Sequence, residues 1–203
     1  MKLKVVLLSV VLSVFTAAAV AAPPRAPGWP HAAPQRAALA DAGAMVRTGM
    51  EQLLDFLQQQ PRPSALKLAA FLGERVTSYF DFEYMARAAV GPAYRRMSAE
   101  QRTGVVQKIE QDFLETLSKR LAGFEDQKVR FFPARRGRGH RTSVTVGIGN
   151  PGRYPARLDF RMYYGKDGWK VYDVAANGNS AVNYYRQKFS RVWGRPAPYR
   201  GRI

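Results

Sequence analysis

The spacing of apolar residues changes from a helical period to a strand-like period near Gln127, and this change limits the possible folds most. Upstream, apolar residues recur every three to four positions, a pattern typical of amphipathic helices. Downstream, apolar and polar residues alternate, as they do in strands with one buried face. A series of helices followed by a series of strands indicates an α+β domain in which helices cover one face of the sheet.

The helical part predicts four helices. Ser64 and Asp81 can cap the second and third helices, and Ser98 with Gln101 forms a capping-box pair that opens the fourth. Gly123 is the expected stop of the fourth helix. The predicted spans are residues 35–60, 65–76, 82–90 and 99–122. The first helix has an apolar face formed by Leu39, Met45, Val46, Met50, Leu53, Leu54 and Leu57.

The second part predicts a four-stranded antiparallel, curved sheet, with a mixed edge as an alternative, and a closing helix. Asp167-Gly168 is a hairpin signal, because Gly supplies the positive φ that a tight turn needs. Asn177-Gly178-Asn179 ends the last strand, and Ser180 can cap the closing helix. The outline resembles an NTF2-like cone. The predicted strands lie around Val129–Phe131, Val144–Ile148, Leu158–Tyr164 and Trp169–Val174.

The two ends of the chain differ in composition from this domain. Residues 1–21 have a basic start, an apolar run and an Ala-rich end, the pattern of a cleavable secretory signal peptide. Cleavage before Val20 and an uncleaved membrane anchor are the alternatives. Residues 22–34 are a Pro-rich linker, and residues 194–203 a mobile basic tail. The domain itself spans residues 35–193.

The charge and the rare residues limit the chemistry. The chain has 32 Lys and Arg against 15 Asp and Glu, which favours anionic partners such as nucleic acid, anionic lipid or acidic proteins. The absence of cysteine excludes thiol catalysis, disulfides and a lipid-modified N-terminal Cys. Two histidines and scattered carboxylates give no metal-ligand spacing, so we expect no metal site and no cofactor.

Catalysis and nucleic-acid binding have weak signals. Gly178-Asn179-Ser180 lies where a nucleophile elbow would lie, but Val182 replaces its second glycine. Asp81, Glu83 and Asp173 are acid–base candidates for a cone-fold enzyme, and the alternative is that they cap or end elements. The basic segment 135–141 resembles RNA-binding segments, whereas a secreted chain meets little nucleic acid. We therefore expect neither an enzyme nor a nucleic-acid binder.

Large apolar residues are abundant: 11 Phe, 10 Tyr, 3 Trp and 6 Met. They fill an ordinary packed core, or they line an internal cavity for an apolar ligand between sheet and helices. Periodicity selects the residues of such a cavity. They are Tyr84, Phe113, Leu117, Val144, Val146, Ile148, Leu158, Phe160, Met162, Tyr164, Val182, Tyr185 and Phe189.

Three motifs resemble the MlaC-type, or toluene-tolerance, family of periplasmic phospholipid-binding proteins. The first runs from Asp81 to Arg87 with Val90-Gly91, and the second from Ser98 to Arg102. The third combines residues 168–174, Gly178-x-Ser180 and Tyr185-Arg186-x-x-Phe189. The resemblance covers residues 35–193, and the chain departs from the family pattern at Asn179 and Ala181, where larger apolar residues are usual.

The resemblance implies a periplasmic carrier that moves phospholipid between the outer and inner membranes in an Mla-type lipid-asymmetry system. Its implied partners are an inner-membrane ABC transporter with a lipid-binding component, an outer-membrane lipoprotein complex and, transiently, the membrane surface. The acyl chains would lie in the cavity, with Arg186 as a candidate headgroup contact. A hopanoid or other isoprenoid is the alternative cargo.

Overall fold

The computed structural model describes residues 32–124, 127–149 and 155–193. The predicted signal peptide, most of the linker and the C-terminal tail lie outside these residues. The helices are α1 (Ala32–Leu57), α2 (Ala65–Phe71), α3 (Phe82–Val90), α4 (Ala99–Ala122) and α5 (Ala181–Trp193). The strands are β1 (Val129–Phe131), β2 (Arg135–Arg136), β3 (Arg141–Ile148), β4 (Ala156–Gly165), β5 (Gly168–Ala176) and β6 (Asn179–Ser180). The expected α+β class is therefore confirmed.

The sheet has the order β1-β3-β4-β5-β6, with β2 also paired to β3, and all of these pairings are antiparallel. Its four longer strands are the four that the sequence predicts. The sequence did not reveal β2 and β6, because strands of two residues are too short to show an alternation. A parallel bridge between Phe80 and Val171 is the mixed element at the edge.

Local capping explains where most helices begin. Ser64 accepts a hydrogen bond from Lys67 N at 3.3 Å, and Ser98 forms the predicted capping box with Gln101. The predicted second helix is α-helical only to Phe71, after which a π-helical segment, Leu72–Val76, and a 3-10 turn, Thr77–Tyr79, continue the chain. In the β4–β5 hairpin, Gly168 takes a φ of +92°, as the Asp-Gly signal predicts.

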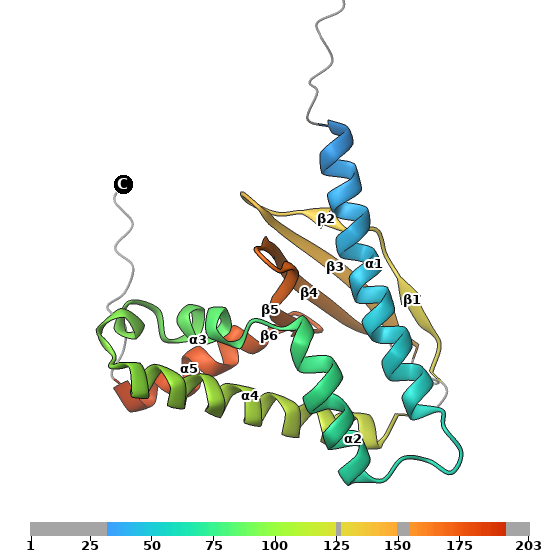
Figure 1. Cartoon of the computed structure of the whole chain (residues 1–203), viewed down its shortest axis with the longest axis horizontal. Helices are drawn as coiled ribbons and strands as arrows, with labels where there is room; N and C mark the ends of the chain where they lie inside the picture. Colours follow the sequence, from blue (N-terminus) through green and yellow to red (C-terminus); the bar gives the residue numbers. More distant parts are fainter. Residues whose placement is uncertain (1–31, 125–126, 150–154, 194–203) are drawn as a thin grey trace, which may run out of the picture.

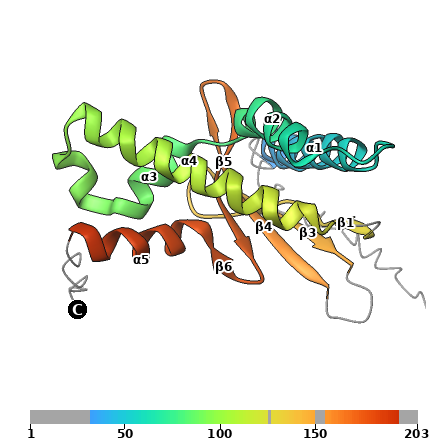
Figure 2. The same ribbon diagram turned by 90° about the horizontal axis from the view of Figure 1, so that it is seen from below.

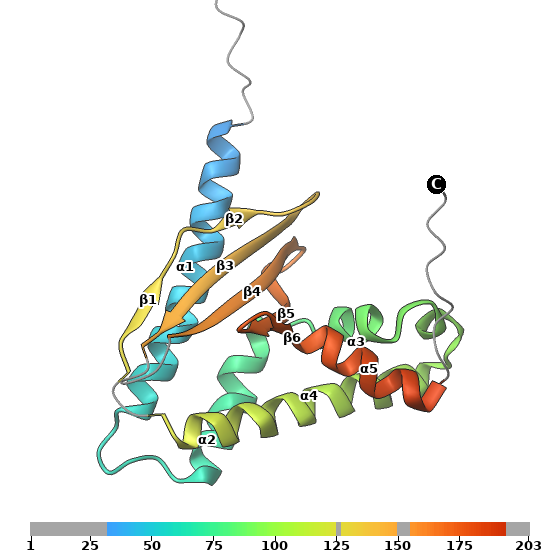
Figure 3. The same cartoon turned by 180° about the vertical axis from the view of Figure 1, so that it is seen from behind.

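The helices lie on different sides of the sheet. α1 runs along one face, whereas α4 runs below the sheet with α3 and α5 beside it (Figures 1 and 3). α3 reaches the opposite face near the β4–β5 hairpin, where the Tyr84 ring contacts the rings of Tyr163 and Tyr172. The expectation that helices cover one face therefore holds for α1, while α3 covers part of the other.

Three clusters of buried side chains form the core. One lies between α3, α4 and α5 and includes Met85, Ile109 and Tyr185. A second lies between α1 and the sheet, and a third lies where α1 meets α2 and α4. Figure 2 shows α4 passing between the α3–α5 side and the α1–α2 side of the molecule. In the described ranges, no helix is long and apolar enough to cross a membrane.

A candidate lipid-binding cavity

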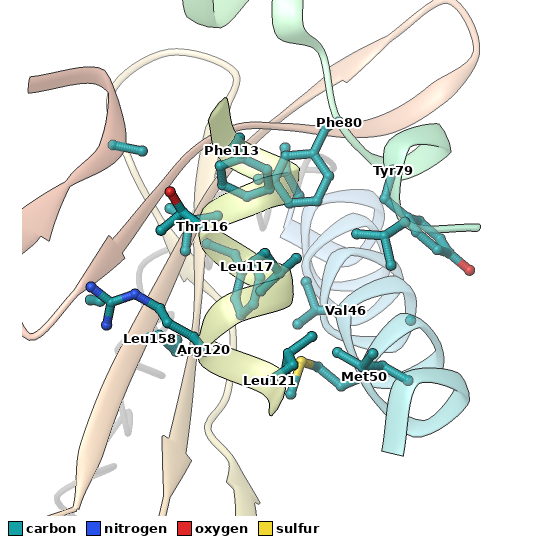
Figure 4. Close-up of a pocket in the computed structure, with 18 of the residues that line it drawn as sticks. Val46, Met50, Tyr79, Phe80, Phe113, Thr116, Leu117, Arg120, Leu121 and Leu158 are labelled. Atoms are coloured by element: carbon teal, nitrogen blue, oxygen red, sulfur yellow. The ribbon is translucent and has the colours of Figure 1, made fainter. Parts of the chain in front are cut away.

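A cavity of about 640 Å³ lies among the three clusters, and each cluster contributes side chains to its wall. Figure 4 shows the wall from α1, α4 and the segment before α3. α1 contributes Met45, Val46, Gly49, Met50, Leu53, Leu54 and Leu57. The segment before α3 contributes Val76, Tyr79 and Phe80. Helix α4 and the residues just after it contribute Phe113, Thr116, Leu117, Arg120, Leu121 and Phe124. Strands β3, β4 and β5 contribute Ile148, Leu158, Phe160, Val171, Val174 and Ala176. The β5–β6 turn with β6 contributes Asn177, Asn179 and Ser180, and α5 contributes Ala181, Tyr184 and Tyr185.

Most residues of the cavity wall are apolar, and several of its exposed residues are polar. Helical spacing places Val46, Met50 and Leu53 on one face of α1, and Phe113, Leu117 and Leu121 on one face of α4. The polar and exposed residues of the wall, which we call the polar rim, are Thr116, Arg120, Asn177, Asn179 and Tyr184. Among the residues described, Arg120 is the only charged side chain on this wall.

A β-bulge changes which residues of β5 face the cavity. Arg161 pairs with Asp173 but Met162 pairs with Val171, so Tyr172 is an extra residue in β5. Because of this extra residue, Val171 and Val174 both line the cavity although three positions separate them. Strict alternation would place only one of them on the cavity side, and the predicted cavity residues include neither.

Six of the thirteen predicted cavity residues lie on the wall: Phe113, Leu117, Ile148, Leu158, Phe160 and Tyr185. Val144, Val146 and Met162 face the same side of the sheet, but Ala42 and Val46 of α1 pack directly over them and leave no space. Tyr164 is 63% exposed at the end of its hairpin, where its ring meets the Trp169 ring edge-on.

The other three predicted residues lie outside the cavity for a different reason. Val182 and Phe189 point toward α3 and α4 in the first buried cluster, and Tyr84 lies on the far face of the sheet. Arg186 is also elsewhere, since its guanidinium donates to Asn183 Oδ1 at 2.9 Å and to the Ala88 carbonyl at 3.0 Å. Neither contact is with a residue of the cavity wall.

The α1 wall is the largest part that the sequence analysis did not assign to the site. The sequence does show that this helix has an apolar face, because apolar residues recur with a helical period over residues 39–57. Nothing in that period distinguishes a helix that packs tightly on a sheet from one that stands away from it. α1 does both: Ala42 is fully buried against the sheet, whereas Met50 and Leu54 line the cavity.

The corner that leads into α5 is fixed by a buried carboxylate. Asp173 is 1% exposed, and it accepts hydrogen bonds from Arg161 Nη1 at 2.7 Å and Val182 N at 3.0 Å. Ser180 Oγ donates to the same carboxylate and accepts from Asn183 N at 3.1 Å. The carboxylate thus compensates the positive N-terminal end of α5, and Ser180 acts as the predicted cap.

Asp81, another carboxylate considered as an acid–base group, also caps a helix. Asp81 Oδ1 accepts a hydrogen bond from Tyr84 N at 2.7 Å at the start of α3, and Oδ2 accepts one from the Tyr163 hydroxyl. Burial, together with this hydrogen bond to Asp81, raises the pKa of Tyr163 to about 12. Neither Asp81 nor Asp173 lies on the cavity wall. Within the described ranges, no group of three His, Asp or Glu side chains could hold a metal ion.

Comparison with known proteins assigns the family. A solved phospholipid-binding protein from Ralstonia solanacearum, determined in complex with a phospholipid, shares the fold with a TM-score of 0.68 and 24% sequence identity. The similarity covers 74% of this chain and 86% of that chain. No curated protein matches the chain significantly. The sequence pattern of the MlaC protein family matches residues 47–195, which is well over half of the chain, and the chain therefore belongs to the MlaC family.

Proposed function

We propose that this protein is a periplasmic carrier of phospholipid and that the acyl chains of its cargo lie in the cavity between α1, α4 and the sheet. The observation that carries the proposal is the cavity itself, which is large and has apolar side chains from all its walls. Large apolar cavities with few polar groups are typical of sites for hydrophobic ligands. The family membership and the phospholipid in the Ralstonia solanacearum protein support the same cargo class.

The volume agrees with hydrocarbon cargo. If a methylene takes about the 30 Å³ of a liquid water molecule, the cavity of about 640 Å³ holds on the order of 20 methylenes. Two acyl chains contain about 30 methylenes and, at about 0.8 kcal/mol each, would cost on the order of 20 kcal/mol in water. The cavity would cover most of this hydrocarbon, and the remainder would lie at the polar rim beside the headgroup.

The carrier would work by shielding rather than by reaction. Asp81 and Asp173, the two carboxylates considered for acid–base chemistry, are engaged in helix capping. The sequence holds no nucleotide-binding motif, so a partner must supply the energy for directional transfer. An inner-membrane ABC transporter and an outer-membrane lipoprotein complex of an Mla-type system are the proposed partners. The predicted signal peptide supports a periplasmic location.

The decisive experiment is solvent extraction of the purified protein, followed by mass spectrometry of the extract and an uptake assay with labelled phospholipid vesicles. We expect phospholipid in the extract and uptake from the vesicles. Absence of both would refute the carrier. A hopanoid or isoprenoid in the extract, with no phospholipid, would replace the proposed cargo by the alternative one.

A pair of variants tests the location of the cargo. Leu117→Asn places an amide on the cavity wall, whereas Met162→Ala removes a core side chain that is fully buried and lies off the wall. Both should lower stability, the second by about 2–5 kcal/mol. We expect lipid retention to fall in Leu117→Asn at a temperature where both variants are folded, and to persist in Met162→Ala. Equal retention in the two variants would place the cargo elsewhere.

A further inference from the structure

We infer that Arg120 binds the phosphate of the cargo lipid, so that the rim of the cavity selects phosphate-bearing lipids over neutral ones. This inference rests on the proposed function and adds to it a selective residue. Arg120 lies near the C-terminal end of α4 and lines the cavity. In Figure 4 its guanidinium points away from the apolar side chains that include Leu117 and Leu121.

Several basic residues of α4 and of the sheet already have carboxylate partners, and this distinguishes them from Arg120. Lys119 pairs with Glu115 at 2.6 Å, and Lys108 pairs with Asp112 at 3.0 Å. Arg157 and Arg161 pair with Asp159 and Asp173 in the sheet. Over the described ranges, Arg120 has no such carboxylate partner. Its charge is therefore available to an anion at the rim.

The other possible source of positive potential at the rim is the N-terminal end of α5, and it is already compensated. The buried Asp173 carboxylate accepts the Val182 N–H, and Ser180 Oγ accepts the Asn183 N–H. A helix N-terminus whose first N–H groups are satisfied by a carboxylate offers little to a second anion. Arg120 is thus the remaining positive group on the described part of the wall.

The surroundings of Arg120 suit a phosphodiester. Thr116 lies one helical turn before it on the same face of α4 and carries a hydroxyl. Asn177 and Asn179, on the β5–β6 corner, add side-chain amides to the same rim. A guanidinium binds phosphate through two parallel N–H···O bonds, and its aliphatic stem can cover the apolar wall below. The acyl chains inside and the phosphate at the rim would then be held by one connected surface.

The experiment compares two labelled lipids with identical acyl chains, a phosphatidylglycerol and a diacylglycerol, presented to wild type, Arg120→Gln and Lys119→Gln. Lys119→Gln is the matched control, because it removes a neighbouring positive charge that lies off the cavity wall. We expect Arg120→Gln to lower affinity for phosphatidylglycerol about tenfold and to leave diacylglycerol binding unchanged. Lys119→Gln should leave both affinities within about twofold.

Any of the following outcomes would overturn the inference. An equal loss for the two lipids would mean that Arg120 acts on the fold or the acyl site. An unchanged phosphatidylglycerol affinity in Arg120→Gln, or the same loss in Lys119→Gln, would mean that Arg120 makes no specific phosphate contact. Glycerol phosphate without acyl chains is a further probe: strong competition by it would mean a site for free phosphate esters. If the wild type binds neither lipid, the proposed function fails and this inference with it.

Discussion

The Asp173 carboxylate accepts a hydrogen bond from the Ser180 hydroxyl at 2.7 Å, which joins the end of β5 to the start of α5 across the intervening turn. The turn needs Asn177 and Gly178 at positive φ angles of 49° and 85°. The antiparallel β5–β6 pairing closes this reversal, and the side-chain pair ties the residue before α5 to β5. Ser180, Ala181 and Tyr184, which follow the turn, line the cavity, so this pair also positions one side of the wall.

Removing the charge of Asp173 should destabilise the protein strongly. Asp173→Asn leaves the Arg161 guanidinium and the start of α5 without their buried anionic partner, and we expect a loss of about 2–4 kcal/mol in the free energy of unfolding. Ser180→Ala should cost about 1 kcal/mol, the usual effect of losing an N-cap. Urea denaturation measures both. The exposed turn variant Asp167→Asn is the control and should change stability by less than about 0.5 kcal/mol.

Tyr163 should make stability depend on alkaline pH. Its pKa is raised to about 12 in the folded protein, above the ordinary 10, first by burial and then by Asp81. The folded state therefore keeps a proton that the unfolded state releases, so this contribution is complete below pH 10 and is lost as pH rises toward about 12. Wild type should exceed Tyr163→Phe in stability at pH 9, and this advantage should shrink at pH 11. A constant difference between the two proteins would contradict the prediction.

Filling the cavity should remove cargo without unfolding the protein. Ala176 lies on the wall at the end of β5, so the ring in Ala176→Trp would occupy space inside the cavity. We expect less lipid per protein in the solvent extract and slower uptake from vesicles, with a melting temperature close to that of lipid-free wild type. Ala70→Trp, at an exposed position of α2 away from the wall, should keep normal lipid content. Normal loading of Ala176→Trp would argue against cargo at this end of the cavity.

Two glycines should respond in opposite directions to alanine. Gly168 has a φ of +92° and Gly104 lies inside α4, and an added Cβ meets no atom within 4 Å at either site. Gly168→Ala should destabilise by about 1–2 kcal/mol through backbone strain alone. Gly104→Ala should stabilise by about 0.5–1 kcal/mol, because alanine loses less conformational freedom in a helix. Thermal or urea denaturation distinguishes the two, and a change of the same sign in both would refute the backbone argument.

The sequence allows prediction of those features that depend on near neighbours in the chain. The Ser64 cap, the Ser98–Gln101 capping box and the positive φ of Gly168 all follow from residues within four positions of one another. The antiparallel meander also follows, because its turns are short. These local rules give the fold class and, where the alternation is unbroken, the face on which an apolar side chain lies.

The position of the cavity depends on distances that no local pattern contains. Val146 and Ile148 have the same alternation on β3, yet Val146 is buried against α1 and Ile148 lines the cavity. The difference arises because α1 lies close to the sheet at one end and away from it at the other. Arg186 and Arg120 both lie on amphipathic helices, and only the packing of these helices determines that Arg120 reaches the cavity.

The three separate clusters around the cavity have a thermodynamic consequence. Each cluster has its own buried side chains, although α1 and α4 each take part in two of the clusters, so the empty protein can stay folded with a hollow centre. A hydrocarbon that fills this centre brings the three clusters into contact through itself and binds the folded state alone, which raises the melting temperature. The melting temperature would then report the fraction of protein that carries lipid. The heat-capacity change on lipid binding would report the apolar surface that the cargo covers.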